Sequence, residues 1–303
     1  MVMRHWIKGL VLILLGIVLP AHGGQVGQVS QGIFYQPQLR DAALGEARWD
    51  EIVAQVKREG FDTLVVQWSR YGDAFAKPEE SDWLAARLQR ARSAGLRLVM
   101  GLYADPAFFQ RQDQSAGSLA RYLDQQERHN LRLAKEWRKR LGEESIAGWY
   151  LPAELDDLNW REPQRQALLA SHLASSVNSL RELAPVPVYA STFFTGKMSP
   201  QAYQAFLSRL AGAGVSLVVQ DGSGTGVLSQ PERELYLSAL APCAGRVSGL
   251  IHELFVQQAG GTTFRAEPLD EAQQRALWAA PVRCGSLRWF FSLRYLPGLS
   301  DMR

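Results

Sequence analysis

The sequence predicts a single (β/α)8 TIM barrel, an α/β fold, behind an N-terminal signal peptide. Eight short runs of β-branched and aromatic residues alternate with longer segments of helical periodicity. Several of these runs are almost continuously apolar, as expected for parallel strands that helices cover. About 280 residues follow the N-terminal segment, a normal size for one closed barrel. An open doubly wound sheet is the alternative, but the first run, GIFYQPQLRD, lacks the glycine-rich turn typical of that fold.

Residues 1–23 have the layout of a cleaved secretory signal peptide. Arg4 and Lys8 precede or flank the apolar run GLVLILLGIVL, and the small residues Ala21 and Gly23 follow it. The run has about 11 residues, whereas a membrane-spanning helix needs roughly 20. An uncleaved anchor is the alternative. We therefore expect a periplasmic or secreted protein with no membrane span after cleavage, whose barrel covers residues 24–303.

The expected elements follow one another in a regular order. The helix after the second strand is expected to have Ser81 as its cap and Gly95 at its end, and Ser118 is expected to begin a longer helix. Other start signals are Pro163, Pro200, Pro231 and Asp270. The eight expected strands cover residues 32–37, 63–68, 96–103, 146–154, 186–192, 215–221, 247–255 and 286–293.

The charge of the chain gives no support for a nucleic-acid partner. The formal net charge is +3, and removal of Arg4 and Lys8 with the signal peptide lowers it by two, to +1. The sequence contains no run of Lys and Arg residues that would form a basic patch. We therefore expect a partner other than DNA or RNA.

The two cysteines are candidates for a disulfide. Cys243 precedes the seventh expected strand and Cys284 precedes the eighth. In a barrel both would lie at the N-terminal rim on adjacent strands, and an exported protein can form a disulfide. Two free thiols are the alternative. A bridge here would join the bottom of the barrel, away from an active site.

Two glutamates end strands that face each other in a barrel. Glu154, in GWYLPAELDD, ends the fourth strand, and Glu253, in LIHELF, lies near the end of the seventh. Active-site groups of TIM barrels sit at the C-terminal ends of strands. One glutamate at such a place is usually a helix cap or a surface charge. Two that converge across the mouth have the composition needed to cleave a glycosidic bond, because one carboxyl protonates the leaving oxygen while the other attacks or activates water.

This arrangement resembles the retaining barrel glycoside hydrolases of clan A. The mature chain also resembles, through GWYLPAELDD and QDGSG, a bacterial family of secreted barrel domains of unknown function placed near those hydrolases. The resemblance implies that Glu154 is the acid/base and Glu253 the nucleophile, without a cofactor. One difference is Ala153, where clan A enzymes have an Asn that contacts the sugar 2-hydroxyl. That difference leaves three interpretations open: another group contacts this hydroxyl, the sugar is substituted there, for example N-acetylated, or the barrel has lost catalysis.

Further polar candidates lie beside the two glutamates. Asp221 ends the sixth strand and is expected to hold substrate, to tune Glu253 or to cap its own loop. Gln220 is a weaker candidate, and His252 is expected to pack beside or hydrogen-bond the strand-7 glutamate. Asp156 and Asp157 are expected to be loop residues or helix caps, although either could be the acid of an inverting enzyme.

Aromatic residues near the same rim suggest a carbohydrate ligand, because sugar rings present C–H faces that stack on aromatic rings. The alternative is that these side chains simply fill the barrel. The resemblance to clan A implies that the last of them forms a floor beneath the reactive sugar. The candidates are Tyr35, Trp68, Tyr103, Trp160 and Trp289.

Other chemistries lack their motifs. The segment HEL at 252–254 has no second His for a zinc protease, and no His, Cys, Asp or Glu set has metal-ligand spacing. We therefore predict an exported glycoside hydrolase that cleaves a polysaccharide or oligosaccharide, an exopolysaccharide being one candidate, with no metal and no cofactor. A transglycosylase would use the same residues. The alternative from another class is a non-catalytic carbohydrate-binding barrel that assists exopolysaccharide production or export machinery.

Overall fold

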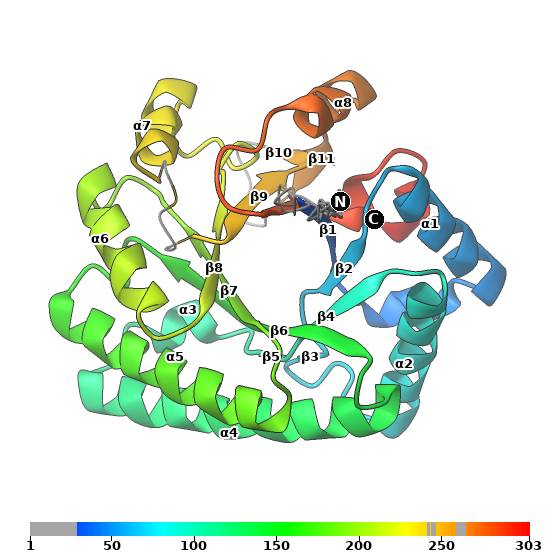
Figure 1. The fold of residues 1–303 in the computed structure, drawn as a ribbon, viewed down its shortest axis with the longest axis horizontal. Helices are drawn as coiled ribbons and strands as arrows, with labels where there is room; N and C mark the ends of the chain where they lie inside the picture. Colours follow the sequence, from blue (N-terminus) through cyan, green and yellow to red (C-terminus); the bar gives the residue numbers. More distant parts are fainter. Residues whose placement is uncertain (1–28, 241–242, 244–246, 259–264) are drawn as a thin grey trace, which may run out of the picture.

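A closed barrel of eight parallel strands forms the centre of the protein (Figure 1). The computed structural model describes residues 29–240, 243, 247–258 and 265–303, so the predicted signal peptide lies outside the described residues. The strand order is β1-β12-β9-β8-β7-β6-β4-β2. The strands are β1 (Ser30–Tyr35), β2 (Thr63–Val66), β4 (Arg97–Gly101), β6 (Ile146–Asp156), β7 (Val188–Phe193), β8 (Ser216–Gln220), β9 (Gly249–Glu253) and β12 (Leu287–Phe291). The predicted (β/α)8 fold and all eight predicted strands are confirmed.

Helices surround the barrel, with α4 and α5 along the bottom of Figure 1 and α2 and then α1 following on the right. The α-helices are α1 (Glu46–Arg58), α2 (Pro78–Ser93), α3 (Phe108–Arg111), α4 (Ala116–Leu141), α5 (Pro163–Leu183), α6 (Pro200–Ala211), α7 (Gln230–Leu240) and α8 (Glu271–Ala279). Within the described ranges, the 3-10 helices are η1 (Leu39–Ala43), η2 (Leu293–Tyr295) and η3 (Ser300–Met302). Two small sheets were not predicted: β3 (Arg70–Tyr71) with β5 (Tyr103–Ala104), and the antiparallel pair β10 (Phe255–Gln257) and β11 (Ala266–Pro268). Over the ranges the structure describes, no helix is both long and apolar enough to cross a membrane.

Two predicted helix starts were wrong by two to four residues. Helix α2 begins at Pro78, because proline suits the first helical position, and the hydroxyl of Ser81 instead donates a hydrogen bond to the carbonyl of Phe75 (2.9 Å). Helix α4 is capped by Ser115, whose Oγ accepts from the N–H of Ser118 (3.4 Å). Both errors are local and leave the barrel unchanged.

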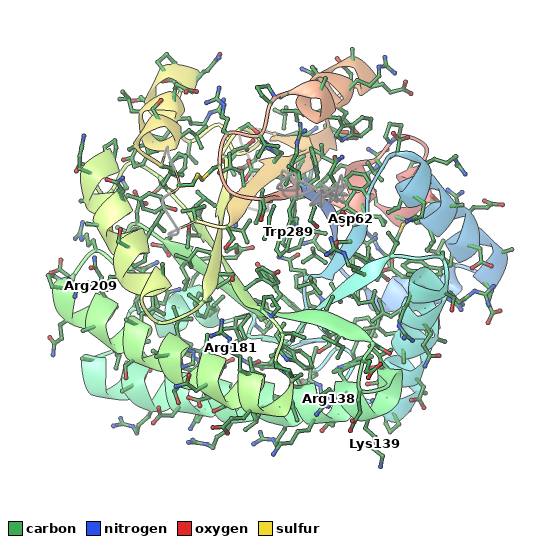
Figure 2. The ribbon with its side chains drawn as sticks, in the orientation of Figure 1. Asp62, Arg138, Lys139, Arg181, Arg209 and Trp289 are labelled. Atoms are coloured by element: carbon green, nitrogen blue, oxygen red, sulfur yellow. A yellow bond between two sulfur atoms is a disulfide. The ribbon has the colours of Figure 1, made fainter. Side chains whose placement is uncertain are left out.

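Side chains fill the inside of the barrel below its C-terminal mouth. Trp289, labelled among the strands in Figure 2, is the largest of them and is almost completely buried. Gly32 makes room for it, because a Cβ at this glycine would lie 2.5 Å from the Cδ1 atom of the indole. The other buried residues of this inner cluster are Phe34, Val65, Val99, Tyr150, Val218 and Ile251. The interior is therefore a packed core on which a site at the mouth can rest.

A disulfide joins Cys243 to Cys284, with their Cα atoms 5.4 Å apart. The two cysteines precede β9 and β12, which pair directly in the barrel. The bridge therefore lies at the end of the barrel opposite the C-terminal mouth.

Candidate active site

A cavity of about 490 Å³ opens at the C-terminal ends of the strands, and both predicted glutamates line it. Among the described residues of the wall, these two glutamates are the only ones with acidic side chains. Across the described ranges, no group of three or more His, Cys, Asp or Glu residues is placed to hold a metal ion. The wall consists of Gln36, Gln38, Arg40, Gln67, Glu154, Gln220, Thr225, Glu253, Phe255, Ala266, Phe291, Arg294, Tyr295 and Arg303.

A bulge in β6 positions Glu154. Leu151 pairs with Ala190 of β7, but the next pair joins Glu154 to Ser191, so Pro152 and Ala153 are extra residues without partners in the ladder. The bulge brings the half-buried Glu154 beside Ser191, whose hydroxyl lies 2.7 Å from the hydroxyl of Tyr150 inside the barrel. Glu154 therefore stands on top of the inner core, at the floor of the cavity.

The amide of Gln67 contacts Glu154. Gln67 follows the last residue of β2, and its Nε2 atom donates a hydrogen bond to Oε1 of Glu154, with 3.3 Å between the two atoms. Ala153, where clan A enzymes have Asn, packs against the hydrophobic core that the strands share with the surrounding helices, and it is absent from the cavity wall. An amide next to the acid/base candidate is therefore present, but it comes from another strand.

Glu253 is held by the loop that follows β8. Its side chain is only 3% exposed, and Oε2 accepts from the N–H of Gly224 at 2.6 Å. A Cβ at Gly224 would lie 2.5 Å from the carbonyl oxygen of Phe255, so only glycine allows this approach. The Gly224 carbonyl in turn accepts from the N–H of Gln257, which ties the loop to β10.

Asp221 and His252 form a pair outside the cavity wall. The Nδ1 atom of His252 lies 3.0 Å from Oδ2 of Asp221, and the other carboxylate oxygen accepts from the N–H and hydroxyl of Ser223. Asp221 thus caps its own loop. His252 was expected to contact Glu253, but it contacts Asp221 instead. Burial alone would raise the pKa of Asp221, but the bonds from His252 and Ser223 lower it below its usual value.

Both cavity glutamates have raised pKa values. Burial raises the pKa of Glu154. Burial and then the negative charge of Asp221 raise the pKa of Glu253 to about 8, although the N–H groups of Gly224 and Thr225 oppose this rise. The charge of Glu154 adds a smaller increase. At neutral pH the free protein therefore keeps a proton on Glu253 for most of the time.

Three of the predicted aromatic residues are core residues. Tyr35 and Trp160 are completely buried, and Tyr35 packs on Trp49 of α1 with ring centroids 5.1 Å apart. Trp289 lies two residues below the end of β12, and Phe291 is the residue of that strand in the cavity wall. The structure therefore does not bring these three to the two glutamates.

The other two aromatic candidates lie at the rim but outside this wall. The Nε1 atom of Trp68 donates to the carbonyl of Pro37 at 3.0 Å. Tyr103 stacks on His129 of α4, with centroids 4.1 Å apart, beside a separate groove. Of the predicted residues other than the glutamates, Gln220 is the one in the cavity wall.

The two aspartates after Glu154 have structural partners. Asp156 accepts from the N–H groups of Leu158 and Asn159, at 2.8 and 2.6 Å. Asp157 is completely buried and accepts from three N–H groups and one hydroxyl of the loop after β7. Both stabilise loops at the rim, and neither lines the cavity.

Sequence reasoning missed a buried ion pair behind the cavity wall, of which one member, Arg294, lines the cavity. Arg294 of η2 donates through Nη2 to Asp41 of η1 (2.5 Å) and to the carbonyl of Gln36 (2.7 Å). The hydroxyl of Tyr35 donates to the same Asp41 oxygen at 2.9 Å. No local pattern could have found this pair, because its two members are 253 residues apart.

Comparisons with known proteins agree with this fold. A curated relative, the uncharacterized protein YbcH of Escherichia coli (strain K12), is 43% identical over 270 residues, which are 88% of this chain and 90% of that protein. A candidate α-L-fucosidase from Bacteroides thetaiotaomicron VPI-5482 superposes with a TM-score of 0.62 at 17% identity, covering 95% of this chain and 91% of its own. A GH5-4 broad specificity endoglucanase from Clostridum cellulovorans gives 0.51 at 10% identity, over 88% of this chain and 84% of its own.

The descriptions of the two solved structures name a candidate fucosidase and an endoglucanase, and at these identities they show a shared fold alone. The sequence match to a family is stronger, because the profile of the domain of unknown function DUF4434 matches residues 30–289. The chain therefore belongs to the DUF4434 family.

Proposed function

We propose that the protein is a glycoside hydrolase with Glu154 and Glu253 as its catalytic carboxyl groups. The observation that carries the proposal is that both line one cavity at the C-terminal mouth of the barrel, where burial raises the pKa of Glu154. A carboxyl group with a raised pKa is what a general acid requires at neutral pH. The likeness of the fold to glycoside hydrolases supports the same reaction class.

The contacts of the two groups favour different roles. Glu154 accepts one long hydrogen bond and is half-buried, so it is suited to give its proton to the leaving oxygen. Glu253 receives N–H groups of Gly224 and Thr225, which stabilise its anion. In the first step a Glu253 oxygen bonds to the anomeric carbon as the bond to the leaving oxygen breaks and Glu154 protonates that oxygen. In the second step Glu154 takes a proton from the water that releases the sugar.

A buried acceptor beside Glu154 indicates where a sugar hydroxyl would bind. Gln67 is 6% exposed, and its Oε1 atom has no hydrogen-bond partner among the described residues. A buried polar atom without a partner is destabilising, so a ligand hydroxyl that donates to it would be bound strongly. This group would serve in place of the Asn that Ala153 replaces.

The test is turnover on a panel of bacterial exopolysaccharides and plant β-glycans, followed by the release of reducing ends. Glu154→Gln and Glu253→Gln should each lower turnover by about a thousandfold or more, since each removes one essential group. Glu182→Gln, an exposed residue of α5, is the matched control and should act like wild type. Glu253→Ala with added azide should form a glycosyl azide if Glu253 is the nucleophile. Wild-type rates in both cavity variants would exclude the proposal.

A non-catalytic carbohydrate-binding barrel is the second candidate, favoured by the pKa of about 8 for Glu253, because a protonated carboxyl cannot act as a nucleophile. This function predicts glycan binding without release of reducing ends at any pH. An enzyme instead predicts a rate that rises with pH while Glu253 loses its proton. A pH series of turnover and binding on the same glycan separates the two.

Location and partners belong to this proposal as well. We infer export to the periplasm or the medium from residues 1–23, which cell fractionation and N-terminal sequencing of the mature chain would test. Polysaccharide as the substrate, and exopolysaccharide machinery as a partner, stay predictions. Added acceptor sugars would distinguish a transglycosylase from a hydrolase by the appearance of longer products.

A further inference from the structure

The wall of the cavity contains three arginines from the C-terminal end of the chain and from the segment after β1. Arg40 belongs to η1, Arg294 to η2, and Arg303 follows η3. The remaining polar lining is mostly neutral, with the amides of Gln36, Gln38, Gln67 and Gln220. Apart from the two catalytic candidates, no described side chain in the wall is acidic. The wall therefore has more positive charge than a neutral sugar would need.

One of the three arginines is fixed in place. Arg294 is 4% exposed, and Asp41 matches its charge through the 2.5 Å contact. Its Nε atom is buried and has no partner among the described residues. Arg294 thus holds a firm position in the wall, with one N–H donor that the protein itself does not satisfy.

The other two arginines are exposed and unpaired. The guanidinium groups of Arg40 and Arg303 form no hydrogen bond or ion pair with the rest of the described chain. Arg303 lies close enough to Tyr295 to act on it: burial raises the pKa of this tyrosine, and Arg294 and Arg303 oppose the rise. The exposed Glu267 of β11 also acts on Tyr295, but its Oε1 accepts from Gln258.

We propose that the cavity binds a glycan whose sugars carry an anionic group, with Arg40 and Arg303 as its direct partners. This inference rests on the proposed function only in placing a glycan in this cavity. A guanidinium matches the planar carboxylate of a uronic acid, and also a sulfate ester, through paired N–H donors. When Glu253 is ionised, the two arginines also offset the repulsion that its carboxylate would exert on an acidic sugar. A neutral glycan would leave both without a counter-charge.

The experiment measures binding with Glu253→Gln, so that turnover cannot consume the ligand. Alginate, polygalacturonate, hyaluronan and dextran sulfate are compared by affinity electrophoresis with dextran and with the three uronates after reduction of their carboxylates to alcohols. The tightest binder is then titrated calorimetrically. We expect an acidic polymer to bind about tenfold or more tightly than its neutral counterpart, and 0.5 M NaCl to weaken the difference because salt screens exposed charges. Comparison of dextran sulfate with the three uronates shows whether the bound group is a sulfate ester or a carboxylate.

Substitution of the arginines tests whether they are the partners. Arg40→Gln with Arg303→Gln should remove most of the preference for the acidic polymer. Arg209→Gln, an exposed residue of α6 labelled at the edge of the molecule in Figure 2, changes charge by the same amount per site and should have no effect. Equal binding of acidic and neutral forms, no binding of any acidic polymer, or an unchanged preference in the double variant would each overturn the inference.

Its failure is separable from failure of the proposed function. Cleavage of a neutral glycan at the same rate by wild type and the double variant would keep the hydrolase and remove the acidic substrate. Arginine-dependent binding of an acidic glycan without turnover in wild type would keep the acidic ligand and remove the hydrolase.

Discussion

Glu253→Gln should stabilise the protein, and increasingly so as the pH rises. The carboxyl of Glu253 has a pKa of about 8 in the folded protein against an ordinary value of 4.5. Between these values the folded chain holds a proton that the unfolded chain has lost, so the free energy of unfolding falls as pH rises through this window. Glutamine has nearly the same shape and cannot ionise. The variant therefore loses this part of the pH dependence.

The size of the effect follows from the same pKa values. One pKa unit corresponds to about 1.36 kcal/mol, so the change from 4.5 to about 8 amounts to at most ~5 kcal/mol across the window. We expect a smaller difference in practice, about 2–3 kcal/mol at pH 8, because the buried amide keeps only part of the hydrogen bonding with Gly224. Near pH 5 little of the ionisation effect remains, so the same loss of hydrogen bonding should make the variant equal in stability to wild type or about 1 kcal/mol less stable.

The assay is urea unfolding followed by tryptophan fluorescence at several pH values between about 5 and 8. Wild type, Glu253→Gln and the exposed control Glu182→Gln are compared with the disulfide intact. The gap between wild type and Glu253→Gln should widen with pH, whereas the control should follow wild type. A gap that stays constant across this range would refute a raised pKa for Glu253.

Three further predictions concern the support of the site. Replacing Cys243 and Cys284 by Ala should lower the free energy of unfolding by about 4 kcal/mol, because the bridge spans a sequence separation of 41, and reductant should lower wild type towards the variant in the same urea titration. Gly224→Ala should lower both stability, by about 1–3 kcal/mol, and turnover, since its Cβ meets a backbone oxygen at 2.5 Å; unchanged values would show that the loop can shift. Tyr35→Phe should lower stability by about 1 kcal/mol through loss of the hydrogen bond to Asp41, and an unchanged urea midpoint would contradict that account.

The sequence was informative about strands and about where each strand ends. Eight apolar runs mark eight strands, because a strand buried on both faces must be apolar along its length. The end of each run then marks the mouth of the barrel, which is how Glu154 and Glu253 were found. Both signals depend only on neighbouring residues.

The same apolar character hides which face of a strand points inward. Tyr35 was expected at the mouth, but it points to α1, while the preceding Phe34 fills the barrel. In a strand with one solvated face, polar residues alternate with apolar ones and show which residues point inward. A strand buried on both faces has few polar residues, so this signal is missing. The sequence also did not show which residue of a strand lies closest to the mouth. Trp289 and Phe291 point to the same side of β12, but only Phe291 lines the cavity. Long-range pairs such as Asp41 with Arg294 leave no local signal.

The features that build the site are departures from a regular barrel that stability alone does not explain. Pro152 and Ala153 interrupt the pairing of β6 with β7. Position 224 is a glycine, and the absence of a side chain allows its N–H to approach Glu253. Glu253 itself is a buried carboxyl group with a raised pKa. Each of these weakens the folded state relative to an uninterrupted strand or an apolar side chain. They share one consequence, which is that two carboxyl groups are presented to a single cavity, and a role for these groups in binding or cleaving a ligand accounts for all three together.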